Sequence, residues 1–138
     1  MRYVLDTNIL IAALNGDPAV IARLDEVEPF EEAILPAIAL AELRFGASSS
    51  RRVSENLARI DRMLERVAFA PVDRPIAERF GDLKADLRRR GITKSDADLL
   101  IAATALELGA ILVTNDLDLL DGSIHQLLVE NWIGSAAP

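Results

Sequence analysis

The sequence predicts an α/β protein with a mostly parallel central sheet, and three observations support this. Short apolar runs typical of strands alternate with longer segments of helical periodicity, which is the pattern of parallel strands joined by crossover helices. Hydrophobic residues make up 51% of the chain and aromatic residues only 4%, a composition that suits a sheet covered by helices better than a β-sandwich. The length of 138 residues fits a single domain, expected to span residues 1–138.

The expected elements follow from hydrophobic periodicity and from turn-forming residues. We expect strands over 2–6, 32–36, 68–72, 110–114 and 126–132, and helices over 9–14, 18–27, 37–46, 51–67, 73–90 and 95–108. The Gly16-Asp17-Pro18 turn separates the first two helices, and Gly109 ends the last. The stretch NDLDLLDG, residues 115–122, is expected to be a polar turn.

The residue types present limit the chemistry of the chain. It contains no cysteine and a single histidine, His125, which excludes thiolate metal sites and disfavours a zinc site built from imidazoles. A metal ion would need oxygen ligands, and these favour Mg²⁺ or Mn²⁺. The formal net charge of −7 argues against a protein that coats nucleic acid. Neither a signal peptide nor an apolar run of membrane-spanning length is present, so we expect a cytoplasmic protein without membrane contact.

Acidic residues occupy several positions that a hydrophobic core does not require. Asp6 and Asp116 follow the carboxyl ends of expected strands. Asp98 opens the last expected helix, and Glu42 interrupts an apolar one. Each also has a purely structural explanation: Asp6 and Asp98 are good helix caps, and Asp116 suits an ordinary turn. Glu42 would be satisfied on an exposed helix edge or by pairing with Arg44.

The joint arrangement of these acids is more informative than any one of them. In a doubly wound sheet such positions converge on one edge. Carboxylates gathered there repel one another unless protons or a hard divalent cation neutralise them. A Mg²⁺ or Mn²⁺ ion favours phosphoester hydrolysis, because it lowers the pKa of a bound water and neutralises charge on phosphoryl oxygens. Thr7, Asn8 and Thr114 are candidates to hydrogen-bond the acids or the waters of the metal.

The chain resembles the PIN-domain ribonucleases, specifically the VapC-type toxins of prokaryotic toxin–antitoxin pairs. The matching stretches are VLDTNILIAAL (4–14), LPAIALAELRFGA (35–47), DADLLIAATALELGAILVTND (96–116) and LLVENW (127–132). The resemblance implies a three-layer α/β/α fold and a Mg²⁺- or Mn²⁺-dependent endoribonuclease whose metal-binding, catalytic acids are Asp6, Glu42, Asp98 and Asp116. It also implies an RNA substrate, a VapB-type antitoxin that occludes the site, and a homodimer.

Two departures from the family pattern bear on the site. Where similar proteins carry an acid followed by an aromatic residue, this chain has Leu119-Leu120, so Asp116 and Asp118 are both candidates for the fourth acid. The turn before Asp98 reads ITKSDAD, whereas it is often rich in glycine and proline in similar proteins.

Holding an anionic substrate on an acidic protein requires local positive charge. The candidate RNA contacts lie between a helix end and the turn before Asp98, and they are Arg88, Arg89, Arg90 and Lys94. The same residues suit a solvated helix C-terminus, whose dipole they complement.

Two other functions compete with the nuclease hypothesis. A phosphatase of the haloacid dehalogenase type would use Asp6 as a nucleophile, but it would need a second aspartate in place of Asn8 and would leave Glu42 without a task. A PIN-like module that only binds RNA or a partner is disfavoured because all the acids are present.

Overall fold

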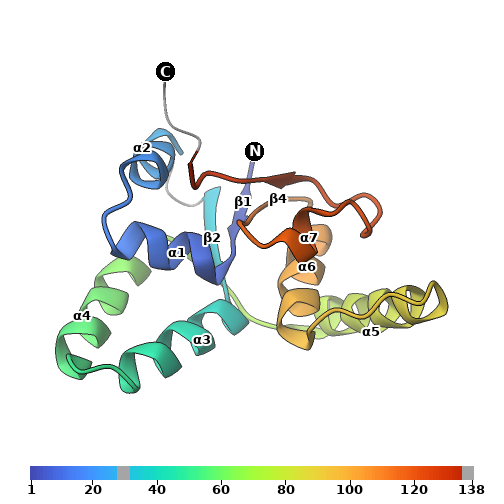
Figure 1. Cartoon of the computed structure of the whole chain (residues 1–138), viewed down its shortest axis with the longest axis horizontal. Coiled ribbons are helices and arrows are strands. Elements are labelled where there is room, and N and C mark those ends of the chain that lie inside the picture. The colour runs from blue at the N-terminus through green and yellow to red at the C-terminus, as the bar shows by residue number, and fades with distance from the viewer. Residues whose placement is uncertain (28–31, 135–138) are drawn as a thin grey trace.

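The computed structural model describes residues 1–27 and 32–134, and it arranges them around one sheet (Figure 1). The strands are β1 (Tyr3–Leu5), β2 (Ala33–Pro36), β3 (Ala68–Ala70), β4 (Ile111–Val113) and β5 (Val129–Glu130). The helices are α1 (Thr7–Leu14), α2 (Pro18–Glu26), α3 (Ala37–Ser48), α4 (Val53–Leu64), α5 (Arg74–Arg89), α6 (Asp96–Leu108) and α7 (Leu117–Leu120). None of the helices in these ranges is both long and apolar enough to cross a membrane.

All paired strands run parallel, in the order β3-β2-β1-β4-β5. Val4 of β1 pairs with Ile34 of β2 on one side and with Leu112 of β4 on the other. The chain builds outward from β1 to β3 and then returns to lay β4 against β1. The direction of winding therefore changes between β1 and β4. In open α/β sheets, ligands bind outside the carboxyl ends of the strands at such a switch point.

Alternation along the strands divides the core into two parts, because successive side chains of a strand point to opposite faces. Leu5 and Val113 pack with the helices α1 to α4, whereas their neighbours Val4 and Leu112 pack with α5, α6 and α7. Figure 1 shows these two groups of helices on opposite sides of the sheet. Burial on both faces of the sheet explains why the strands β1 to β4 consist of apolar residues. The predicted three-layer α/β/α fold is confirmed.

The end of α3 lies beyond the expected position. The helix continues through Gly46 to Ser48, although glycine near the end of an apolar run is a common stop signal. A glycine inside a helix costs only about 1 kcal/mol. Leu43 and Ala47 are buried in the core on either side of Gly46, and this packing keeps the backbone helical.

The stretch 115–122 was expected to be a polar turn, and this expectation is wrong in part. It contains α7, which begins after Asp116 as its N-cap. Leu119 is buried in the core shared with α5 and α6. So short a helix has no periodicity to detect in the sequence, and it depends on its tertiary packing because isolated short helices are unstable in water.

Trp132 anchors the C-terminal end of the described chain, and its side chain is fully buried. Its ring lies against Tyr3 of β1 with the ring centroids 5.3 Å apart, and the guanidinium of Arg23 lies 4.9 Å from the ring centroid. The indole Nε1 donates a hydrogen bond of 3.0 Å to Glu130 Oε1, which also accepts from Arg23 Nη2 at 2.9 Å. Trp132 therefore ties β5 and α2 to the core.

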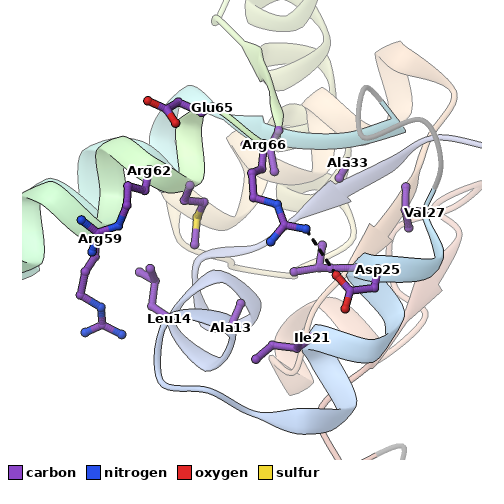
Figure 2. A pocket seen from close by; sticks show the side chains of 13 residues that line it. Ala13, Leu14, Ile21, Asp25, Val27, Ala33, Arg59, Arg62, Glu65 and Arg66 are labelled. Carbon is purple, nitrogen blue, oxygen red and sulfur yellow. Dashed lines mark hydrogen bonds and ion pairs between the residues drawn. The ribbon is translucent and has the colours of Figure 1, made fainter.

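A groove of about 1280 Å³ opens on the side of α1, α2 and α4 (Figure 2). Apolar side chains of these helices form much of its lining. Arg59 and Arg62 of α4 and Arg66 of the turn after it add positive charge. Arg66 pairs with Asp25 of α2 at 3.3 Å. Arg59 and Arg62 form no ion pair with any residue in the described ranges, and Arg59 donates only to the amide oxygen of Asn56. The groove thus combines an apolar lining with positive charge.

The burial of Trp132 predicts a large loss of stability when its side chain is removed. Trp132→Ala should lower the free energy of unfolding by about 3–5 kcal/mol, because it leaves a cavity between β1 and α2. Leu128→Ala is the matched control from the same segment, since Leu128 is exposed, and it should change stability by less than about 0.5 kcal/mol. Urea unfolding followed by circular dichroism measures both, and equal midpoints for the two variants would contradict the prediction.

Candidate functional site

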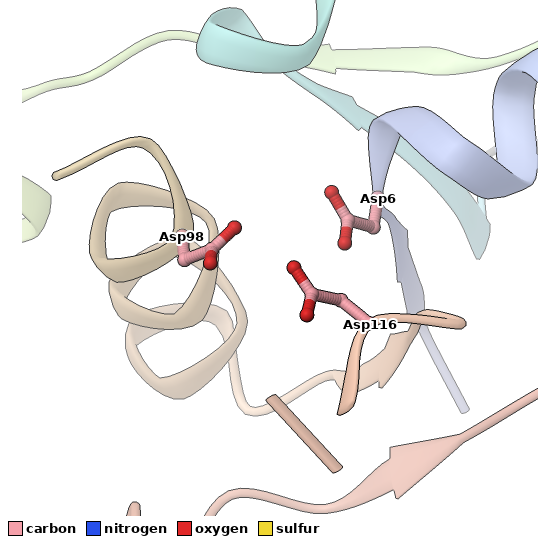
Figure 3. A group of neighbouring side chains, drawn as sticks. All are labelled: Asp6, Asp98 and Asp116. Atoms are coloured by element: carbon pink, nitrogen blue, oxygen red, sulfur yellow. The ribbon is translucent and has the colours of Figure 1, made fainter. Parts of the chain in front are cut away.

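Three aspartates from distant parts of the sequence meet at the switch point of the sheet (Figure 3). Asp6 follows β1, Asp116 lies shortly after β4, and Asp98 lies in the first turn of α6. One carboxylate oxygen of each lies within 4.8 Å of the corresponding oxygens of the other two, and the side chains point toward one another. The structure therefore brings together three of the acids selected from the sequence.

Asp6 lies deepest in this cluster, with 4% of its surface exposed. Its Oδ1 accepts a hydrogen bond of 2.7 Å from the backbone N–H of Thr7, which makes it the N-cap of α1. Its Oδ2 accepts from Asn8 Nδ2 at 3.1 Å and from Thr114 Oγ1 at 2.7 Å. Asp6 is thus both the N-cap of α1 and a member of the cluster.

Burial makes the negative charge of the cluster costly. It raises the pKa of Asp6 above its ordinary value, and this effect outweighs the hydrogen bonds that the carboxylate accepts. Burial also raises the pKa of Asp98 to about 6, with a further contribution from the negative charge of Asp116. The protein alone therefore neutralises these carboxylates poorly.

Thr114 connects two of the acids, and its side chain is fully buried. Its hydroxyl donates to Asp6 and accepts a hydrogen bond of 3.0 Å from the backbone N–H of Asp116. Asp116 Oδ1 in turn accepts from the backbone N–H of Asp118 at 2.9 Å and caps α7. Asp118 is exposed and does not belong to the cluster. Of the two candidates for the fourth acid, Asp116 is the one that faces Asp6.

Asp98 and Asp96 lie in the same first turn of α6 but face different partners. Ser95 caps the helix by accepting a hydrogen bond of 3.1 Å from the backbone N–H of Asp98. The Asp98 carboxylate faces the cluster, whereas Asp96 forms an ion pair of 2.8 Å with Lys84 of α5. The capping signal in the sequence is therefore real, and it leaves the Asp98 carboxylate available to the site.

Glu42 lies beside the cluster and is exposed on α3. Thr7 Oγ1 donates a hydrogen bond of 2.6 Å to Glu42 Oε1, while the backbone N–H of Thr7 binds Asp6. One threonine thus links the two acids. The alternative expectation was an ion pair with Arg44, and no such pair occurs within residues 1–27 and 32–134.

A chain of side-chain amides extends the site to the C-terminal segment. Asn8 donates to Asp6, and its Oδ1 accepts from the backbone N–H of Asn115 at 2.9 Å. Asn131 Nδ2 donates to Asn115 Oδ1 at 2.8 Å. Neither Asn115 nor Asn131 is among the site residues that the sequence predicts. Asn115 lies between two selected residues, but Asn131 offers no signal because its contact depends on the pairing of β5 with β4.

The structure divides the cations that were selected as RNA contacts. Arg88 and Arg89 are exposed at the C-terminal end of α5 and have no ion-pair partner in the described part of the chain. Arg90 forms an ion pair within its own helix region. The side chain of Lys94 is only 3% exposed and pairs with Asp121 at 2.9 Å.

The donor set suits a hard divalent cation. Oxygen atoms of three carboxylates lie close together, and oxygen ligands of this kind favour Mg²⁺ or Mn²⁺. Burial raises the pKa values of Asp6 and Asp98, and the negative charge of Asp116 adds to both shifts. The residues present therefore fit a divalent metal ion.

Comparison with known proteins agrees with the fold. The model of the PIN domain family matches residues 3–123. The ribonuclease VapC2 of Rickettsia felis is 32% identical over 133 residues, which covers 96% of this chain and 98% of the relative. The tRNA(fMet)-specific endonuclease VapC of Shigella flexneri is 31% identical over 116 residues, covering 84% and 87%.

Solved structures lead to the same class. A chain from the VapBC2 complex of Rickettsia felis, bound to a DNA fragment from its promoter, matches with a TM-score of 0.87 and 32% identity, covering 96% of this chain and 99% of that one. A chain from VapBC-1 of nontypeable Haemophilus influenzae matches with a TM-score of 0.84 and 29% identity over 96% and 99%. The protein belongs to the PIN-domain family and, within it, to the VapC ribonuclease toxins of toxin–antitoxin systems.

The raised pKa of Asp98 predicts the pH dependence of stability in the metal-free protein. A folded-state pKa of about 6 lies above the ordinary value of 3.8, so the folded state keeps a proton that the unfolded chain has released. The stabilisation from this proton is present at low pH and is lost as the pH rises through about 6. We expect the melting temperature in EDTA to fall between about pH 4 and pH 7, and to fall less for Asp98→Asn.

Asp96→Asn is the matched control, because Asp96 lies in the same helical turn but pairs with Lys84 away from the cluster. Its melting temperature should retain the pH dependence of the parent. Thermal melts of the three proteins in EDTA at several pH values test the prediction, which parallel curves for the parent and Asp98→Asn would contradict.

Proposed function

We propose that the chain is a Mg²⁺- or Mn²⁺-dependent endoribonuclease that uses water to cleave phosphodiester bonds of RNA. The observation that carries this proposal is the meeting of three aspartates at the sheet's switch point in a PIN-family chain. A divalent cation held there supplies an activated water and neutralises charge that develops on the phosphoryl oxygens. The relatives named ribonucleases support the same reaction.

In this proposal the side chains divide the work according to their positions. Asp6, Asp98 and Asp116 hold the cation, since their oxygens are the ones that lie together. Glu42 adds negative charge from the exposed side of the site, where Thr7 links it to Asp6. Thr114 fixes the orientation of Asp6 and Asp116 relative to each other through its hydroxyl.

The RNA itself is a phosphate-rich anion that needs cations at the rim of the site. We retain Arg88 and Arg89 as RNA contacts, because they are exposed and unpaired within the described ranges. The relative from Shigella flexneri is named for tRNA(fMet), so a tRNA is the first substrate to test. We place the reaction in the cytoplasm, where translation supplies such RNA.

The phosphatase hypothesis is less well supported by the contacts of Asp6. Position 8 is an amide that donates to Asp6, so it does not supply the second acid of that mechanism. The other rival hypothesis is a PIN-like module that binds RNA or a partner without cleaving RNA. Only a cleavage assay distinguishes such a module from the proposed enzyme.

We infer a VapB-type antitoxin as the protein partner, because the matching solved structures are VapBC complexes. The groove of Figure 2 is its proposed docking surface. The apolar lining suits the apolar face of a helix, and Arg59 and Arg62 suit acidic residues beside that face. A homodimer, which the resemblance implies, stays a prediction that light scattering of the purified chain tests.

Removal of single acids should separate metal binding from turnover. Asp98→Asn should abolish both Mn²⁺-dependent RNA cleavage and thermal stabilisation by Mn²⁺, since stabilisation follows from binding to the native state. Glu42→Gln should lower cleavage by roughly 10–100-fold and retain most of the stabilisation, because Glu42 lies outside the cluster. The measurements are cleavage of tRNA with mapped ends and thermal melts with and without Mn²⁺. Cleavage by the parent in EDTA at the same rate would overturn the metal mechanism.

Charge reversal on the groove should weaken antitoxin binding. The double variant Arg59→Glu, Arg62→Glu is expected to raise the dissociation constant for a VapB-type antitoxin, because like charges then oppose each other at the groove. Arg51→Glu is the control, since Arg51 is exposed but does not line the groove. Titration calorimetry with a purified VapB-type antitoxin measures the affinities of the parent, the double variant and Arg51→Glu, and equal affinities would exclude the groove as the docking surface.

A further inference from the structure

The turn before α6 and the loop after β4 are joined by one buried cation. The Lys94 side chain is 3% exposed, and its Nζ donates to the backbone carbonyl of Asp118 and to Asp121 Oδ2, the latter at 2.9 Å. Lys94 directly precedes Ser95, the N-cap of α6. Asp118 and Asp121 lie within α7 and at its end. The cation therefore holds together the two segments that carry Asp98 and Asp116.

We propose that Lys94 is a positioning residue that sets the placement of Asp116 relative to Asp98 for metal binding. This inference rests on the proposed function, since it concerns the same acidic cluster. Lys94 acts through the backbone of α7 and does not itself touch the reacting atoms.

The contacts of Lys94 add to the packing of Leu119 in stabilising α7. A helix of one turn leaves its carbonyls without intrahelical partners, and Lys94 supplies a donor to one of them. Asp121 also accepts from the Ser123 hydroxyl at 2.6 Å, and hydrogen bonds from Ser123 and Lys94 lower the pKa of Asp121 to about 2. The carboxylate thus remains charged opposite the buried ammonium, which would be costly to bury alone.

A second bond from the same turn supports this arrangement. Arg90 Nη2 donates to the backbone carbonyl of Ser123 at 2.8 Å. The turn after α5 therefore holds the loop after β4 at two places. Lys94 binds Asp118 and Asp121, and Arg90 binds Ser123. Because Asp116 caps the first turn of α7, movement of α7 changes where the Asp116 carboxylate lies.

The burial of Lys94 also separates this role from the RNA contact expected from the sequence. An RNA-binding lysine has to present its ammonium to phosphates in solvent, and that of Lys94 is used inside the chain. The two roles differ in what a variant changes. Loss of an RNA contact raises KM and flattens the salt dependence, whereas loss of a positioning residue weakens metal binding and lowers kcat.

The test compares Lys94→Ala, Lys94→Arg and Asp121→Asn with the parent. The first measurement is amide hydrogen exchange of residues 117–123 without metal, and the second is Mn²⁺ binding by thermal shift. The third is kcat and KM for RNA cleavage. Lys94→Ala should speed exchange in this segment and raise the Mn²⁺ concentration for half-maximal stabilisation by roughly tenfold or more. It should lower kcat and leave KM and the salt dependence unchanged. Lys94→Arg should recover part of each loss.

Lys84→Ala is the matched control, because it removes an exposed ion pair of 2.8 Å between Lys84 and Asp96, the first residue of α6. It should leave Mn²⁺ binding and exchange of 117–123 unchanged. If Lys94→Ala fails to fold, Asp121→Asn replaces it, with smaller effects in the same direction. The double variant Lys94→Ala, Asp121→Asn should weaken Mn²⁺ binding little more than Lys94→Ala alone, since both substitutions remove the same ion pair.

Unchanged Mn²⁺ binding in Lys94→Ala and Asp121→Asn would overturn the proposal, as would a rise in KM at constant kcat. Failure of the parent to cleave RNA would overturn the proposed function alone, because exchange and Mn²⁺ binding are measured without RNA. A parent that binds no Mn²⁺ would overturn both.

Discussion

Repulsion among carboxylates held together at the sheet edge is the constraint on which the rest of the site depends. Asp6, Asp98 and Asp116 are close enough to oppose each other's ionisation, and Asp6 is almost completely buried. Such an arrangement costs free energy in the metal-free protein, so the surrounding fold has to keep the acids from separating. The same cost becomes an advantage when a divalent cation is bound, because the cation neutralises charge that the protein leaves uncompensated.

The restraint comes from hydrogen bonds that originate in several separate segments. Thr114 and Asn8 bind the same oxygen of Asp6, and Asn131 reaches this network from the C-terminal side through Asn115. These donors are short side chains next to strand ends, where the backbone is held by the parallel sheet. A site supported in this way keeps like charges together through contacts from several segments.

The topology gives the site its location. Because β4 lies beside β1, Asp6 and Asp116 reach the same edge of the sheet, where the two strands end. The N-terminus of α6 brings Asp98 to this edge from one helical layer. Glu42 comes from the opposite layer through α3 and meets the cluster only by way of Thr7. The acids thus approach from both helical layers.

The sequence by itself determined the layered α/β fold, the acids and most of their neighbours, because hydrophobic periodicity and polar residues at strand ends are local signals. It did not determine that Glu42 stands apart from the three aspartates, since the direction of a helix relative to a sheet edge depends on packing. Nor did it reveal α7 or the roles of Asn131 and Lys94. A surface cation and a buried one look alike in a sequence, and only the docking of α7 onto the turn after α5 decided that Lys94 is enclosed.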